Sequence, residues 1–172
     1  MSDALKTLAD KAAVVEGLPE HPAVKALLAW NSAALMDAKF DRGELTLTVA
    51  PEEIRGAAAA VQVAGYNFFE DVTAVDWFPS EPRFQLSYHI VSHSYKERIR
   101  LRVLLNGTSP EGDLPSVETI TSVWPSANFY EREVFDLFGI RFAGHPNLRR
   151  IMLPDDWEDH PLRKDYPVEG YR

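Results

Sequence analysis

Prolines and large apolar side chains share the C-terminal stretch that follows Ile140, and this combination constrains the fold more than any other feature. Its prolines fix φ and remove backbone donors, so the stretch resists both helix and sheet: Pro146, Pro154, Pro161 and Pro167. Solvated disordered tails are poor in large apolar residues, but this stretch contains Phe142, Leu148, Ile151, Leu153, Trp157, Leu162 and Tyr166. We therefore expect it to lie along a surface, that of its own domain or of another subunit. We favour another subunit, because long structureless segments of compact domains are usually functional.

The composition excludes several classes of function. With 26 acidic and 18 basic side chains the net charge is −8, which disfavours binding to a nucleic-acid backbone. The chain has no cysteine, so it holds no disulfide and no thiolate-ligated zinc or iron–sulfur cluster by itself. The first residues lack a basic region followed by an apolar one, and no apolar run approaches the roughly 18 residues of a membrane span. We expect a cytoplasmic protein, or one held to a membrane only through a partner.

Hydrophobic periodicity predicts a two-layer α+β domain. The predicted elements are helices at 3–15 and 22–33, a β-hairpin at 35–49, a helix at 51–64, strands at 72–78, 84–90 and 99–105, and helices at 116–124 and 128–138. In the last strand Leu101 alternates with arginines, so one face of the sheet is apolar and the other polar. This pattern is typical of a mostly antiparallel sheet with helices on one face. We predict such a domain at 1–140, followed by an extended partner-docking arm at 141–172.

The helix at 128–138 carries terminal signals and one unusual carboxylate. Asn128 with Glu131 three residues later forms a capping box, and Gly139 suits the position after the helix. Glu131 also lies among aromatic residues, where a carboxylate needs donors. The candidate donors are the amide at the start of the helix and the guanidinium of Arg149 or Arg150. Either Glu131 is an ordinary capping residue, or it is a charge lock that fastens the arm or a partner.

Three further charges lie together on the other side of this helix. They are Arg132, Glu133 and Asp136. Arg132 and Asp136 are four residues apart, which allows them to pair.

Two other chemical hypotheses come from the charged residues. A small metal-dependent hydrolase would use the acids and histidines of the arm, namely Asp155, Asp156, Glu158, Asp159, His145 and His160. Each of these histidines precedes a proline on extended backbone, without the helical spacing that brings metal ligands together. An adaptor would receive an acidic partner on the arginine row of the last strand, Arg98, Arg100 and Arg102. No phosphate-binding, dinucleotide-binding or acyl-transfer motif occurs.

Three motifs in order resemble one family. They are Glu131-Arg132-Glu133 with Asp136 and Gly139, then Gly144-His145-Pro146-Asn147-Leu148-Arg149-Arg150-Ile151, and finally His160-Pro161-Leu162-Arg163-Lys164-Asp165-Tyr166-Pro167. This pattern closely resembles the 30 kDa subunit of the proton-pumping NADH-quinone oxidoreductase, respiratory complex I. The resemblance extends more loosely upstream to about Glu70.

The resemblance implies a cofactor-free scaffold in the peripheral arm of the complex, on the cytoplasmic face of the inner (plasma) membrane and held there through the complex. FMN, the iron–sulfur clusters and quinone belong to other subunits, and no residue of this chain is expected to be catalytic. The expected partners are the quinone-site subunit and neighbouring iron–sulfur subunits. The residues expected to bind them are Glu131, Arg132, Glu133, Asp136, Gly139, His145, Pro146, Arg149, Arg150, His160, Pro161, Leu162, Arg163, Lys164, Asp165 and Tyr166.

Related subunits belong to membrane-bound hydrogenases and to complexes that take electrons from ferredoxin or a deazaflavin. The motifs of the helix alone do not separate these groups. The complete motif at 160–167 favours the quinone-reducing group. The resemblance also implies that the arm is cleaved readily by proteases when the partner is missing.

Overall fold

The computed structural model describes residues 18–108, 114–167 and 169, so the helix predicted at 3–15 lies outside the described residues. In chain order the elements are η1 (Leu18–Glu20), α2 (Pro22–Asn31), β1 (Leu35–Asp41), β2 (Glu44–Val49), η2 (Pro51–Glu53), α3 (Ile54–Val63), β3 (Phe68–Asp76), β4 (Phe84–Ser92), β5 (Glu97–Leu105), β6 (Ser116–Glu118), α4 (Ala127–Phe138) and β7 (Arg141–Ala143). None of the helices in these ranges is long and apolar enough to cross a membrane.

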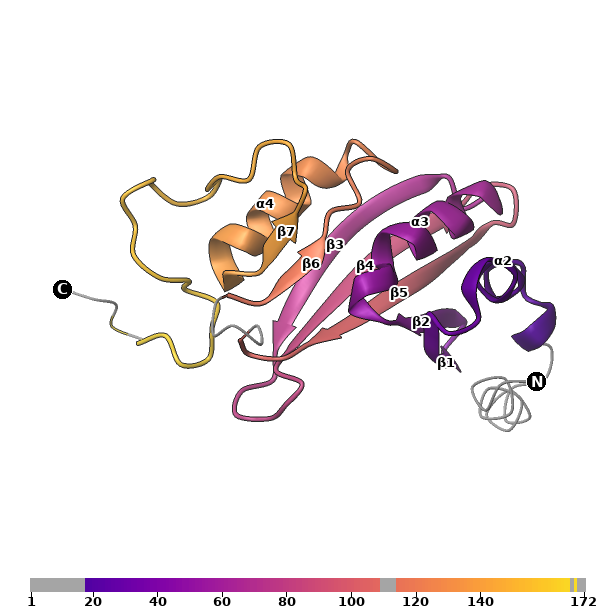
Figure 1. The fold of residues 1–172 in the computed structure, drawn as a ribbon, viewed down its shortest axis with the longest axis horizontal. Helices are drawn as coiled ribbons and strands as arrows, with labels where there is room; N and C mark the ends of the chain where they lie inside the picture. The colour runs from indigo at the N-terminus through magenta and orange to yellow at the C-terminus, as the bar shows by residue number, and fades with distance from the viewer. Residues whose placement is uncertain (1–17, 109–113, 168, 170–172) are drawn as a thin grey trace.

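Five strands form the main sheet, in the order β1-β2-β5-β4-β3. β2 runs parallel to β5, and the other neighbouring pairs are antiparallel. Figure 1 shows the helices together on one face of this sheet. The predicted α+β fold, with a mostly antiparallel sheet covered on one face, is therefore confirmed.

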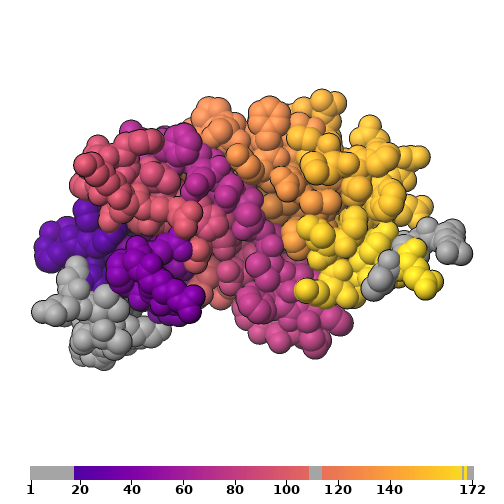
Figure 2. Space-filling view, turned by 180° about the vertical axis from the view of Figure 1, so that it is seen from behind, coloured from indigo at the N-terminus to yellow at the C-terminus, as the bar shows by residue number. Residues whose placement is uncertain are grey.

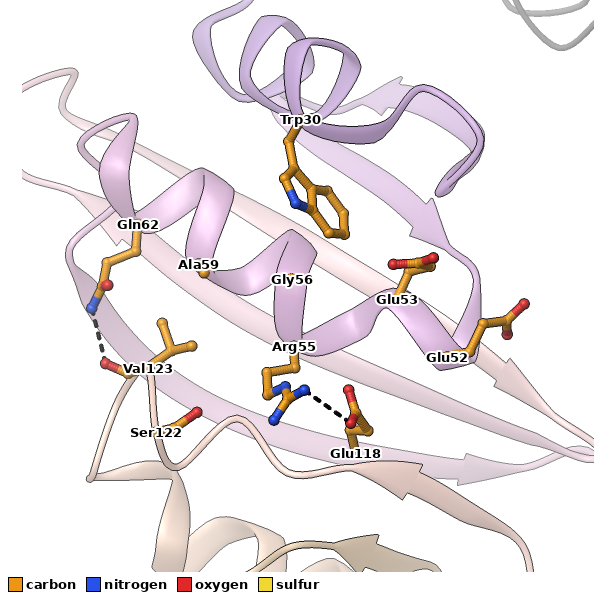
Figure 3. Close-up of a pocket in the computed structure, with 10 residues that line it drawn as sticks. All are labelled: Trp30, Glu52, Glu53, Arg55, Gly56, Ala59, Gln62, Glu118, Ser122 and Val123. Atoms are coloured by element: carbon orange, nitrogen blue, oxygen red, sulfur yellow. Dashed lines mark hydrogen bonds and ion pairs between the residues drawn. The ribbon is translucent and has the colours of Figure 1, made fainter.

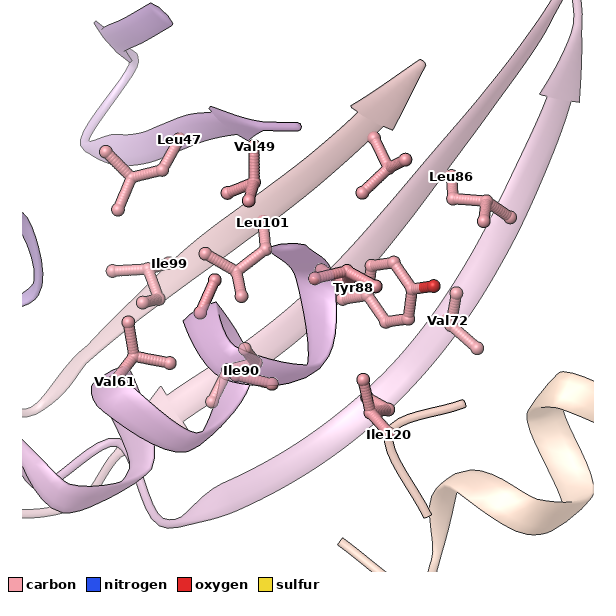
Figure 4. Close-up of a cluster of buried hydrophobic side chains, with 14 of the residues drawn as sticks. Leu47, Val49, Val61, Val72, Leu86, Tyr88, Ile90, Ile99, Leu101 and Ile120 are labelled. Carbon is pink, nitrogen blue, oxygen red and sulfur yellow. The ribbon is translucent and has the colours of Figure 1, made fainter. Parts of the chain in front are cut away.

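The core lies between the sheet and the helices. Alternate residues of β4 and β5 point into it, and Tyr88 and Leu101 are completely buried there (Figure 4). α3 contributes Ile54 and Val61 from one side of the helix, because residues about seven apart fall on the same face. The inward-facing residues, every second one in the strands and one side of the helix, thus pack together in one apolar layer.

The arginine row of β5 stands on the opposite, polar face, as predicted, but its guanidinium groups have partners within the sheet. Arg98 and Arg100 pair with Glu44 of β2 at 2.8 and 2.5 Å. Arg102 donates to the Thr48 hydroxyl at 2.7 Å. An acidic partner would have to displace these contacts, so the structure gives little support to the adaptor hypothesis.

The helix predicted at 116–124 is wrong. Its first residues form β6, which pairs in parallel with β7, so that Val117 lies opposite Phe142. Both side chains are buried. The pairing partner is more than twenty residues away in sequence, and a local capping signal at Ser116 does not reveal it. β7 also means that the start of the predicted arm packs with the domain.

The two ends of α4 differ in how well they were predicted. The helix begins at Ala127 after Ser126, and Asn128 lies inside it, so the predicted capping box is wrong. Gly139 ends the helix with a left-handed φ of 70°, and its N–H donates to the Phe135 carbonyl at 2.9 Å, as predicted. The N-terminal prediction failed because Glu131 turns inward, away from the helix end.

Truncation of Leu101 tests the position of the core. Leu101→Ala removes a completely buried side chain and should lower the free energy of unfolding by about 3 kcal/mol, measured by urea denaturation. Val63→Ala is the matched control, because Val63 is 88% exposed and its loss should change stability by only about 0.5 kcal/mol or less. Equal effects of the two substitutions would contradict this description of the core.

Candidate partner-docking site

The arm, defined here as residues 144–167, runs beside α4 and then reaches the loop between β3 and β4. Figures 1 and 2 show it at the end of the molecule next to α4. The Leu162 amide donates to the Leu137 carbonyl at 3.0 Å, and the Lys164 amide donates to Asp76 at 2.8 Å. The arm therefore follows the surface of its own domain, and docking on another subunit stays a prediction.

Asp136 of α4 is the main anchor of the arm. Its carboxylate is fully buried, and Oδ2 accepts from the successive amides of Ile151, Met152 and Leu153 at 2.9, 2.7 and 3.0 Å. Oδ1 accepts from the Arg150 guanidinium at 2.6 Å. Burial alone would raise the pKa of Asp136, but these four donors hold it below its usual value. The carboxylate is therefore charged at neutral pH and holds the arm at one point.

Arginines fasten the arm on both sides of this anchor. The Arg132 guanidinium donates to the carbonyls of Arg149 and Arg150, both at 3.1 Å. The predicted Arg132–Asp136 pair is therefore wrong, because Arg150 takes the place beside the carboxylate. Arg163 donates to the Phe138 carbonyl at 2.7 Å, at the C-terminal end of α4 where the helix dipole favours a cation.

Gly139 lets the arm approach the end of α4. A Cβ at this position would lie 2.4 Å from the His160 ring and 2.7 Å from the Arg163 guanidinium. The His160 ring donates through Nδ1 to the Asp136 carbonyl at 2.9 Å, and its burial lowers its pKa, which keeps it neutral. Glycine is thus required here both for its positive φ and for this contact.

A second anchor joins the arm to the β3–β4 loop. Arg83 binds Asp76 through two nitrogens, at 2.9 and 2.8 Å, and binds Asp165 of the arm at 2.6 and 3.0 Å. The guanidinium also lies about 5 Å from the rings of Phe78 and Phe84. Burial alone would raise the pKa of Asp76, but Arg83 and two backbone amides lower it to about 2. Both carboxylates are therefore ionised, and they share one fixed cation.

Glu131 lies at the other end of α4 and does not contact the arginines. Its carboxylate is fully buried and accepts from the Thr119 hydroxyl and from the Ile120 amide at 2.8 Å. The buried His145 ring lies 3.9 Å away and donates to the Asn128 carbonyl at 3.2 Å. Burial raises the pKa of Glu131 to about 7, although its two hydrogen bonds oppose this shift. Burial also lowers the pKa of His145, so its ring is neutral.

The arm turns apolar side chains away from the domain. Its backbone and cations face α4, whereas Met152 is 63% exposed and its neighbour Ile151 is 39% exposed. Phe129, on the solvent side of α4, is 62% exposed. Trp157 and Leu162 are exposed further along the arm. Large apolar side chains are therefore exposed along this segment, together with charged ones such as Asp155 and Asp156.

Comparison with known proteins identifies the family of the chain. Residues 47–172 match the family described as respiratory-chain NADH dehydrogenase, 30 kDa subunit. The chain belongs to this family. The match includes α4 and the whole arm, so all the motifs from which the resemblance was inferred lie inside it.

Two relatives illustrate the similarity to other members of the family. A subunit of the NADH-quinone oxidoreductase of Citrifermentans bemidjiense is 46% identical over 138 residues, which cover 80% of this chain and 83% of that protein. The equivalent subunit of the Roseiflexus castenholzii enzyme is 44% identical over 156 residues, covering 87% and 85%. The resemblance inferred from the sequence motifs is thus confirmed.

Two solved structures share the fold of this 30 kDa subunit. A trypsin-resistant fragment (1-134) of Nqo5 is 30% identical with a TM-score of 0.61, covering 74% of this chain and all of the fragment. A chain of the membrane-bound sulfane sulfur reductase, an archaeal respiratory membrane complex, is 26% identical with a TM-score of 0.71. That similarity covers 84% of both chains.

The family motifs fall into two groups in the structure. Some residues act inside the subunit, as described above: Glu131, Arg132, Asp136, Gly139, His145, Arg150, His160, Arg163 and Asp165. The idea that Glu131 binds Arg149 or Arg150 is wrong, because Thr119 and Ile120 already supply its donors.

The other family residues lie nearer to solvent. The side chains of Glu133, Pro146, Arg149, Leu162 and Lys164 are exposed, and Pro161 and Tyr166 are half-buried. The guanidinium of Arg149 has no partner among the described residues. These side chains are available to another protein without rearrangement of the domain.

Several residues that hold the arm were not predicted from the sequence. Asp76 and Arg83 face each other across the β3–β4 loop, and Thr119 meets Glu131. For Asp76 and Arg83, the only local indication in the sequence was that opposite charges occur at the two ends of a predicted loop. Arg83 and Asp165 are 82 positions apart, so nothing in the local sequence links them.

Loss of the Asp136 charge should release the arm. Asp136→Asn keeps the size of the side chain but places a neutral amide against Arg150, and breaking such a buried pair costs about 3–5 kcal/mol. We expect faster trypsin cleavage after Arg149 and Arg150 in the purified chain, followed by mass spectrometry. Glu133→Gln is the matched control, because this exposed carboxylate on the same helix forms no hydrogen bond or ion pair among the described residues. Cleavage of both variants at the wild-type rate would contradict the anchoring role of Asp136.

The buried Glu131 makes stability depend on pH. Its pKa is higher in the folded chain than in the unfolded one, so its contribution is complete below about pH 4.5 and is lost as the pH rises through about 7. Urea denaturation should show the wild type losing up to about 3 kcal/mol relative to Glu131→Gln over this range. The other groups with shifted pKa values are present in both proteins, so their contributions to the pH dependence cancel in the difference. A difference that does not vary with pH would show that Glu131 stays ionised.

Proposed function

We propose that this chain is a cofactor-free structural subunit of a proton-translocating NADH-quinone oxidoreductase, complex I. It docks through the outer face of its arm on the quinone-site subunit and on neighbouring iron–sulfur subunits. It thereby supports electron transfer from NADH to quinone without carrying electrons itself. The observation that carries this proposal is the set of large apolar side chains that the anchored arm exposes, among them Ile151 and Met152.

Exposed apolar side chains on a fixed backbone are the expected form of an interface that awaits a partner. The amides of Ile151 and Met152 are tied to Asp136, so the backbone that carries these side chains is held in place. A pre-ordered surface loses less conformational entropy on binding than a free tail does. The exposed Arg149 guanidinium, which has no partner among the described residues, can supply a polar contact of the kind found at interface rims.

The chemistry of the chain supports a role without cofactors. It has no cysteine, and within the described ranges no group of three or more histidines and acids is placed to hold a metal ion. Both ring nitrogens of His145 are used, because Nε2 donates to the Asn128 carbonyl and Nδ1 accepts from the Asn147 amide. FMN, the clusters and the quinone then belong to the other subunits. The chain sits on the cytoplasmic face of the membrane and is held there by those subunits.

A relative supports the predicted division into a domain at 1–140 and a C-terminal extension at 141–172, of which β7 packs with the domain. The solved Nqo5 structure is that of a trypsin-resistant fragment, 1-134. We propose that the domain of this chain is likewise the protease-resistant part, and that the arm becomes protected in the assembled complex.

A second candidate is the equivalent subunit of a related membrane complex, linked to a hydrogenase, to ferredoxin or to a deazaflavin. The observation that favours it is the similarity to a chain of the membrane-bound sulfane sulfur reductase. The higher identity to subunits of NADH-quinone oxidoreductases favours the first candidate.

A charge placed on the outer face of the arm tests the docking proposal. Met152→Asp should lower the amount of the quinone-site subunit that co-purifies with the chain by about tenfold or more, since each lost ~1.4 kcal/mol of binding free energy is tenfold in affinity. Arg149→Ala should act in the same direction. Stability of the purified chain should change by only about 0.5 kcal/mol, because both side chains are exposed.

Met36→Asp is the matched control for this experiment. It makes the same substitution at a methionine that is 59% exposed on β1, at the other edge of the sheet. Normal assembly with Met152→Asp, or an equal loss with Met36→Asp, would count against docking through the arm.

A further inference from the structure

An open groove lies on the helical side of the domain, away from the arm. It has a volume of about 640 Å³ and lies between α2, the start of α3 and the segment that follows β6 (Figure 3). None of the residues expected to bind partners lines it. The groove is therefore a separate feature that the docking of the arm leaves unexplained.

An indole ring forms one wall of the groove. The ring can lie close to α3 because a glycine faces it there. Trp30 projects from α2 toward Gly56 of α3 and remains 42% exposed (Figure 3). A Cβ on Gly56 would lie 2.0 Å from the indole. The close contact between helix and ring fixes the ring, which leaves part of its surface open to solvent.

Two contacts fix the opposite wall, one between α3 and the end of β6 and one between α3 and the segment that follows β6. The Gln62 amide donates to the Val123 carbonyl at 2.9 Å, and Arg55 pairs with Glu118 at 3.2 Å. Both contacts are drawn in Figure 3. The groove is thus held open between fixed elements, and a ligand would not have to create it.

The lining carries an excess of negative charge. Glu52, Glu53 and Glu118 face it against the single cation Arg55. Glu52 and Glu53 have no partner in the described part of the chain. Their place in the first turn suits the helix dipole, but the dipole does not account for Glu118 on the other wall. The groove therefore combines unpaired carboxylates with an exposed indole.

We propose that this groove binds an arginine of another subunit in the complex. A guanidinium stacks on an indole and at the same time donates in pairs to carboxylates, and both of these partners are present here. The spare negative charge of the lining complements one such cation. This inference rests on the proposed function for the identity of the partner, but the chemistry of the groove can be tested without the complex.

A peptide titration of the isolated full chain tests the chemistry. The probe is acetyl-Ala-Arg-Ala-Arg-Ala-amide, and the readout is the indole N–H signal of Trp30 in nitrogen-15 NMR spectra, assigned with Trp30→Phe. We expect a saturable shift in the millimolar range that weakens at least about tenfold when citrulline replaces arginine, because the charge is lost. Equal binding of the citrulline peptide, or of the corresponding lysine peptide, would overturn the proposal.

Two matched double variants locate the binding. Glu52→Gln with Glu53→Gln removes the unpaired charges of the groove and should abolish the shift. Asp155→Asn with Asp156→Asn removes two neighbouring exposed charges in the arm and should leave the shift unchanged. If both variants weaken binding equally, the peptide responds to net charge and the proposal fails.

Photo-crosslinking in the assembled complex identifies the occupant. A benzoylphenylalanine in place of Ser122, an exposed residue of the groove, should form an adduct with an arginine-containing segment of another subunit. An adduct within the same chain, with a segment that lacks arginine, or no adduct in the assembled complex would overturn the proposal. If no complex assembles at all, the proposed function fails, while the peptide titration still decides the chemistry of the groove.

Discussion

A buried carboxylate and the backbone of an arm without secondary structure supply each other's hydrogen-bond partners in this protein. Asp136 is removed from water, and its own helix offers its side chain no donors. The arm supplies three amides and a guanidinium from consecutive positions, and these amides have no strand or helix of their own. If the arm covered α4 without these hydrogen bonds, both partners would be buried unpaired, which costs several kcal/mol. Together they form one polar contact that fixes the course of the arm.

This contact also determines what the arm shows to solvent. Because amides and cations turn inward, the side chains of Ile151 and Met152 turn outward. The second anchor, Arg83 with Asp165, extends the same arrangement to the β3–β4 loop. Polar contacts with the domain thus hold the arm, while its apolar side chains face outward. A partner can cover these side chains without first breaking the polar contacts.

The sequence revealed the parts of this structure that depend on local periodicity. The alternation through β4 and β5 and the glycine after α4 were predicted because neighbouring residues determine them. The strand at 116–118 was missed, since β7 provides its pairing partner from far along the chain. The partners of Glu131 and Asp136 were missed for the same reason. The motifs indicated which residues of the arm matter, but not that about half of them act within the subunit.

The distribution of satisfied charges indicates which sides of the subunit are suited to partners. On the uncovered face of the sheet, Arg98 and Arg100 share Glu44, and Arg102 binds Thr48, so this face is neutralised from within. Within the described residues, Glu52 and Glu53 on the helical side and Arg149 in the arm have no side-chain partner, and the arm also exposes apolar groups. Unpaired carboxylates thus occur at the groove and exposed apolar groups along the arm, whereas the arginine row on the polar face of the sheet is paired within the sheet. A partner gains most by contacting the first two surfaces, so we expect the sheet face to be the one left to water.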